Sequence, residues 1–131
     1  MNQLLEMYGS VISVYSRAQM FEDGELVDVT ELANSFGIHV PTALTRAVFE
    51  GYVVPDERAR KHGQSEAGRL RDIVWLLRFA AWKNQSSRIV YTVRVVMKEA
   101  LQRDVQLKAI IGPGDDGEPV ITIMTLDEPE N

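Results

Sequence analysis

The stretch that decides the fold is residues 65–84, which read SEAGRLRDIVWLLRFAAWKN. One apolar stripe recurs in it at helical spacing and consists of Leu70, Ile73, Val74, Leu77 and Ala81. Such a stripe is typical of a helix that packs one side against a hydrophobic core. The spacing therefore predicts a long helix over residues 65–84.

A second apolar stripe lies on roughly the opposite side of this helix and consists of Trp75, Phe79 and Trp82. A helix that is apolar on two faces is usually enclosed within its own domain, so we first expect these rings to be buried. The alternative is an exposed patch, flanked by Arg71 and Arg78, that anchors a protein partner or a second copy in a homodimer.

After the helix, the apolar period changes from 3.6 to 2. Residues 88–97 read RIVYTVRVVM and alternate as a half-buried strand does. We expect two further strands at residues 105–111 and 120–124, joined by a hairpin loop over residues 112–118.

The N-terminal half contains several helix signals. Ser16 and Gln19 have the spacing of a capping box, and Gly24 suits the position after a helix end, so residues 16–23 predict a short helix. Residues 26–29 alternate like a brief strand.

Two more helices are expected beyond that strand. Thr30 is a good N-cap for a helix over residues 31–36, and Pro41 suits the first turn of a helix over residues 41–50. The polar residues 55–64 predict an exposed loop.

Together these elements predict one α+β domain over residues 1–125. Short N-terminal helices and one long helix would pack on a C-terminal antiparallel meander of three to four strands. Residues 126–131 contain three acids and a proline, and we expect them to form a flexible tail.

Composition argues against several classes of function. The chain of 131 residues has no cysteine and only two histidines, His39 and His62, which leaves little material for a metal site or a hydrolase triad. We expect no catalytic residue, no metal and no cofactor. The sequence shows no apolar run of the roughly 20 residues that span a bilayer and no signal peptide, so we expect a cytoplasmic protein without membrane contact.

Charge is segregated along the chain. Residues 58–103 hold eleven bases and three acids, whereas the flanking segments are acidic and bring the net charge to −5. The acidic ends could fold against the basic middle and neutralise it. Alternatively, the middle segment could bind nucleic acid through phosphate contacts of Arg71, Arg78, Arg88 and Arg94.

Polar side chains are dense on the first predicted helix. The candidate polar site consists of Tyr15, Arg17, Gln19, Glu22 and Asp23, together with Arg46 from the third helix. Arginine and carboxylates could form an enzyme site there. A weaker alternative is a helix-turn-helix over residues 30–50, which would serve nucleic-acid binding.

Four motifs resemble those of a bacterial family of unknown function. They are YSRAQ at 15–19, EDGELVDVT at 22–30, PTALTRAV at 41–48 and IGPGDDGEPVITIM at 111–124. The resemblance implies a small accessory protein of plasmids, phages and other mobile elements, and it carries no catalytic residues over. Our leading expectation is a non-enzymatic interaction protein that binds a host or defence component. Nucleic-acid binding comes second, and an enzyme at the candidate polar site third.

Overall fold

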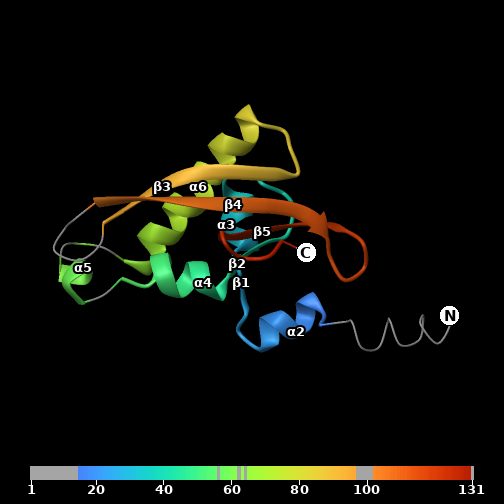
Figure 1. The fold of residues 1–131 in the computed structure, drawn as a ribbon, viewed down its shortest axis with the longest axis horizontal. Helices are drawn as coiled ribbons and strands as arrows, with labels where there is room; N and C mark the ends of the chain where they lie inside the picture. Colours follow the sequence, from blue (N-terminus) through green and yellow to red (C-terminus); the bar gives the residue numbers. More distant parts are fainter. Residues whose placement is uncertain (1–14, 56, 62, 64, 97–101, 131) are drawn as a thin grey trace.

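A five-stranded mixed sheet forms the centre of the molecule (Figure 1). The computed structural model describes residues 15–55, 57–61, 63, 65–96 and 102–130. In the order β1-β2-β5-β4-β3, the strands are β1 (Leu26–Asp28), β2 (Thr42–Thr45), β5 (Pro119–Thr125), β4 (Gln102–Pro113) and β3 (Arg88–Val96). The predicted antiparallel meander is β3-β4-β5, and β2 extends it in parallel beside β5.

Helices precede the meander, as predicted. They are α2 (Arg17–Glu22), α3 (Thr30–Ser35), α4 (Arg46–Val48), a π-helical turn η1 (Phe49–Val53), α5 (Glu57–Lys61) and α6 (Glu66–Lys83). The long helix begins after Ser65, whose hydroxyl accepts the Gly68 N–H at 3.0 Å as an N-cap does. The α+β fold with one long helix is therefore confirmed.

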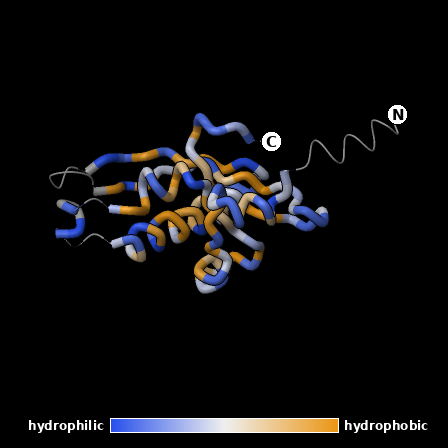
Figure 2. The backbone as a smooth tube through the Cα atoms, turned by 90° about the horizontal axis from the view of Figure 1, so that it is seen from below, coloured by the Kyte–Doolittle hydropathy of each residue, from blue (hydrophilic) through white to orange (hydrophobic). Residues whose placement is uncertain are grey.

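The core lies between α6 and one face of the sheet. Val74 and Leu77 from α6 meet Leu44, Leu107 and Ile123 from three different strands, and all five are almost fully buried. In Figure 2 the strands and α6 carry the hydrophobic stretches of the chain. The predicted core stripe of α6 is thus placed against the sheet, where burial of each large side chain contributes about 2 kcal/mol.

The predicted motifs at the ends of α2 and α3 are present in the structure. The Ser16 hydroxyl accepts the Gln19 N–H, and the Gln19 side chain accepts the Ser16 N–H, which completes the capping box. Gly24 and Gly37 adopt φ angles of 77° and 90°, in the left-handed region that favours glycine after a helix end.

The predicted helix over residues 41–50 is wrong. Thr42–Thr45 is a strand between β1 and β5, and helical backbone starts only at Arg46. Pro41 stands before that strand, a position that proline tolerates. Burial between two strands overrides the local helix signal, so the helix over residues 41–50 that the helix-turn-helix hypothesis requires does not form.

The predicted loop over residues 55–64 also needs correction. It contains the helix α5, whose bounds are Glu57 and Lys61. A single helical turn of polar residues gives no apolar periodicity that sequence inspection would detect.

The second face of the sheet is covered by α2 and by the chain after β5. Lys108 is only 3% exposed there, and its ammonium donates to the Leu126 and Glu128 carbonyl oxygens and to the Glu130 carboxylate. These contacts place residues 126–130 along β4. The expected flexibility of this tail remains a prediction.

Candidate functional site

The three rings of the second stripe lie on the outside of the molecule. We call the group formed by Phe36, Trp75, Arg78, Phe79 and Trp82 the aromatic patch; it lines a hollow of about 270 Å³. Trp75 is 43% exposed, Phe79 48% and Trp82 69%, so the expectation that these rings are buried is wrong. Two layers suffice to enclose the core, and no further layer covers the outer side of α6 within the described residues.

Ring contacts hold the aromatic patch together. Trp75 packs edge-to-face on Phe36 at 5.3 Å and on Phe79 at 5.2 Å between ring centroids. The Arg78 guanidinium donates from Nε to the Phe36 carbonyl oxygen at 3.0 Å, which joins α6 to the end of α3. Sequence inspection missed Phe36 because its place beside Trp75 depends on the packing of two helices.

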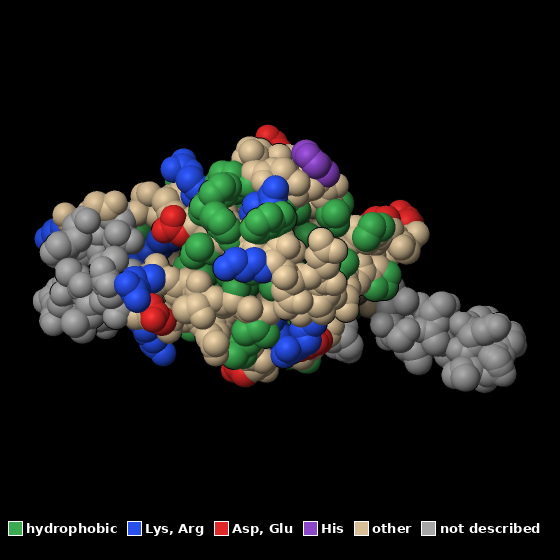
Figure 3. Space-filling model, turned by 90° about the horizontal axis from the view of Figure 1, so that it is seen from above, with side chains coloured by type: hydrophobic (Ala, Val, Ile, Leu, Met, Phe, Trp, Pro, Cys, Tyr) green, Lys and Arg blue, Asp and Glu red, His purple; other side chains and the backbone are tan. Residues whose placement is uncertain are grey.

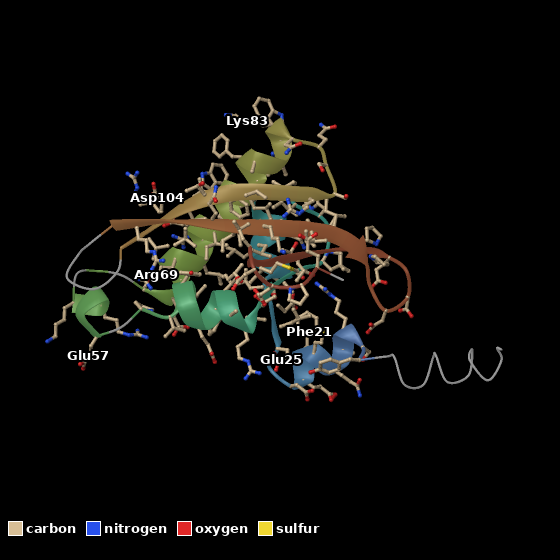
Figure 4. All side chains as sticks on the ribbon, viewed as in Figure 1. Phe21, Glu25, Glu57, Arg69, Lys83 and Asp104 are labelled. Atoms are coloured by element: carbon tan, nitrogen blue, oxygen red, sulfur yellow. The ribbon has the colours of Figure 1, made fainter. Side chains whose placement is uncertain are left out.

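Positive charge flanks the aromatic patch. Arg71 lies one turn before Trp75, and Lys83 lies one turn after Phe79 at the C-terminal end of α6 (Figure 4). Of the two acids of α6, Glu66 stands in the first turn, whereas the exposed Asp72 lies one turn before Trp75, so one acid accompanies the three bases around the patch. Figure 3 shows hydrophobic side chains gathered with Lys and Arg side chains on the face seen from above.

The four predicted nucleic-acid contacts do not gather on one surface. Arg71 and Arg78 belong to the outer side of α6, whereas Arg88 and Arg94 project from the second face of the sheet. Arg88 Nε contacts Glu130 at 2.8 Å and Arg94 Nε contacts Asp104 at 3.0 Å. At these two positions, acids from the C-terminal segment neutralise the basic middle segment.

A groove of about 860 Å³ lies on the second face of the sheet, between α2 and the chain after β5. We call it the second-face groove. Of the candidate polar site, Tyr15, Arg17 and Arg46 line it, and Figure 4 labels Glu25, which also lines it, on the α2 side of the molecule. Gln19 belongs to the capping box, and the exposed Glu22 and Asp23 are not part of the groove lining.

The arginine side chains of the second-face groove are hydrogen-bonded to other groups of the same chain. Arg17 donates from Nη1 to the Thr122 hydroxyl at 2.8 Å and from Nη2 to the Ile121 carbonyl oxygen at 3.1 Å. Arg46 donates to the Glu25 carboxylate, and this hydrogen bond raises the pKa of its guanidinium. Arg17 therefore links α2 to β5, and Arg46 links α4 to the turn before β1.

Tyr15 has its own partner. Its hydroxyl donates to the Asp23 carboxylate at 2.7 Å, and this hydrogen bond raises the pKa of the phenol to about 12. A phenol with that pKa is protonated near neutral pH, so Tyr15 is poorly suited to act as a base.

The 112–118 loop is a hairpin, as predicted, and one of its acids caps the helix α2. The Asp115 carboxylate accepts the Arg17 N–H at 2.7 Å and the Ala18 N–H at 3.0 Å, which satisfies the first turn of α2. These hydrogen bonds lower the pKa of Asp115. The motifs at residues 15–19 and 111–124 thus meet in the fold.

The described part of the chain has neither a metal-binding cluster nor a membrane-spanning helix. No group of three or more histidine, aspartate or glutamate side chains there could hold a metal ion. No helix there is long and apolar enough to cross a bilayer.

Comparison with known proteins places the chain in a family. No curated protein and no solved structure matches it. A family model, described as a family of unknown function (DUF6573), matches residues 1–130. With nearly the whole chain covered, the protein belongs to the DUF6573 family.

Proposed function

We propose that this protein is a non-enzymatic binding protein that recognises a protein partner through the aromatic patch. The observation that carries the proposal is the exposure of Trp75, Phe79 and Trp82 beside one another on α6. Contiguous exposed rings cost solubility and contribute little to the core, whereas aromatic and arginine side chains are the usual anchors of protein interfaces.

Charge around the aromatic patch indicates the chemistry of the partner. Arg71, Arg78 and Lys83 would face acids on a complementary segment, and the hollow would take an apolar side chain. We therefore expect an amphipathic helix with acidic residues beside its apolar face. A second copy docked through the same patch, the predicted homodimer, would bring these bases together and is less favourable.

The cellular setting is a further part of the proposal. The motif resemblance supports a cytoplasmic accessory protein of plasmid or phage DNA, and the partner would then be a host or defence component. Nucleic-acid binding is the second candidate from the sequence, but the division of its four arginines between two surfaces favours the protein partner.

Both tryptophans of the chain belong to the aromatic patch, which gives a direct test. Their emission is recorded during titration with an acidic amphipathic helical peptide and with a matched peptide that carries lysines in place of the acids. We expect a blue shift with the acidic peptide only, because burial moves indole emission to shorter wavelength.

Variants locate that response. Arg71→Glu should weaken binding of the acidic peptide about tenfold, while Lys61→Glu, an exposed base on α5, should leave it unchanged. Equal responses to both peptides, or equal effects of the two substitutions, would remove the proposal. An emission change with single-stranded DNA that disappears with salt would favour nucleic-acid binding instead.

A further inference from the structure

The two edges of the sheet are very different. β1 is an edge of three residues, whereas β3 is an edge of nine residues that pairs with β4 in an uninterrupted register. Within the described residues, no strand pairs with the other side of β3. A short edge strand offers few free main-chain groups for pairing with another chain, whereas a long and regular one is a template for another strand.

β3 lacks most features that usually block an edge, and its two charged residues, Arg88 and Arg94, are paired with acids of the same chain. It contains no proline, glycine or lysine, and its nine pairs with β4 leave no bulge. Its Val90 side chain is 40% exposed on the second face of the sheet. Figure 1 shows β3 running along the margin of the sheet, beyond β4.

Hydrogen bonds at the start of β3 show which main-chain groups point outward. The Ser87 carbonyl oxygen accepts the Ile111 N–H at 2.8 Å. In an antiparallel pair, every second residue is hydrogen-bonded to the same neighbour, so the odd-numbered residues of β3 bond to β4. The Arg88 N–H points away from β4 and donates to the Ser86 hydroxyl at 3.2 Å. By the same alternation, Val90, Thr92 and Arg94 direct their N–H and C=O groups to the open edge.

We propose that the open edge of β3 pairs antiparallel with β3 of a second copy, about a two-fold axis at Thr92. This pairing sets Thr92 opposite Thr92 of the second copy and Val90 opposite Arg94 of the second copy. The three outward residues of each strand then exchange about six main-chain hydrogen bonds, and the two sheets become one.

Side chains support a second copy as the occupant. On the core side, Tyr91 stands opposite Val93 and Ile89 opposite Val95. These side chains are already almost fully buried in their own chain, so the pairing brings no charged group into the core. On the second face, no two like charges stand directly opposite. The Arg94 guanidinium is bound to Asp104 on β4, so its charge is neutralised within its own chain.

The two-fold axis gives the proposal a specific test. Thr92→Lys would place two ammonium groups against each other, and Thr92→Glu would place two carboxylates. We expect the wild-type chain to be a dimer in analytical ultracentrifugation, and each variant to dissociate at least tenfold more readily. An equimolar mixture of the two variants should recover the dimer, because lysine then faces glutamate.

Controls separate pairing from folding. Gln106 stands opposite Thr92 on β4, so Gln106→Lys and Gln106→Glu place the same charges away from the edge and should leave the dimer intact. If a Thr92 variant does not fold, Val90→Lys, which faces Arg94 of the second copy, provides the second measurement. The emission response of the aromatic patch to the acidic peptide should be unchanged in all of them.

Three results would overturn the proposal. They are a wild-type chain that stays monomeric at every concentration, a dimer that persists in both Thr92 variants, and a mixture that dissociates as readily as either variant alone. Loss of the dimer on Trp82→Ala but not on Thr92→Lys would assign self-association to the aromatic patch instead.

Discussion

The aromatic patch and the second-face groove differ in whether their side chains have found partners within the chain. In the groove, Arg17, Arg46 and Tyr15 each have a partner within the chain, although the sequence marks them as candidate site residues. In the patch, large rings stay in water although apolar residues gain most from burial. Polar density in the sequence therefore does not mark free side chains in the groove, whereas the second apolar stripe of α6 does leave large rings exposed.

The two sides of α6 differ in the same way. Leu77 is 1% exposed and faces the core, whereas Trp82 is 69% exposed. The core side contributes the buried packing of the domain, and the proposed binding uses the outer side.

The largest expected effect tests this division of α6. Leu77→Ala should lower the free energy of unfolding by about 3 kcal/mol because it leaves a cavity in the core. Trp82→Ala should change it by less than about 0.5 kcal/mol, as surface substitutions do. Urea unfolding of both variants gives the two values, and a Trp82→Ala loss as large as that of Leu77→Ala would contradict the assignment.

A smaller effect is expected in the second-face groove. Arg17→Met removes the hydrogen bonds to Thr122 and Ile121 and should cost about 1 kcal/mol, since the side chain is only partly buried. Peptide binding at the aromatic patch should not change. A loss of peptide binding without a loss of stability would show that the groove belongs to the binding surface.

The third prediction concerns pH and the contact between Asp115 and α2. The folded pKa of Asp115 is lowered, first by its hydrogen bond from the Arg17 N–H and then by that from Ala18. Its contribution is therefore present above the unfolded pKa of about 3.9 and is lost as pH falls through the lower folded value. The protection of the Arg17 and Ala18 amides, which is their exchange rate relative to an unstructured chain at the same pH, should decrease across that window.

Variants of the hairpin test the same contact at neutral pH. Asp115→Asn should accelerate exchange of these two amides, because a neutral amide is a weaker acceptor than a carboxylate. Asp116→Asn, at the neighbouring exposed acid, is the matched control and should have no effect. Equal exchange rates in the two variants would rule out capping by Asp115.

The smallest effect is expected at Tyr15. NMR titration should give its phenol a pKa of about 12, and Asp23→Asn should move that value toward the ordinary 10. Because the folded pKa is raised, the favourable contribution is present below about 10 and is lost as pH rises through about 12. A Tyr15 that titrates near 10 in the wild-type chain would exclude the hydrogen bond to Asp23.

Sequence reasoning succeeded where neighbouring residues decide the structure. The capping box at Ser16, the turn at Gly24 and the extent of α6 depend on groups within a few residues of one another. The strand over residues 88–96 could be predicted equally well, since alternation is a local pattern.

It failed at Thr42–Thr45, where the local signal favours a helix. That segment is a strand because β1 and β5 offer hydrogen bonds on both sides and bury three of its four residues. One of the two neighbours is β5, which lies more than 70 residues further along the chain, and no inspection of a short window can include it.

The sequence by itself determined the α+β class, the long helix, the alternating strands and the presence of two apolar stripes on α6. Only the tertiary structure decided which stripe is buried, which arginines are paired and which strand edge is open. The reason is physical: periodicity and capping are local, whereas burial and pairing depend on segments that meet only after the chain has folded.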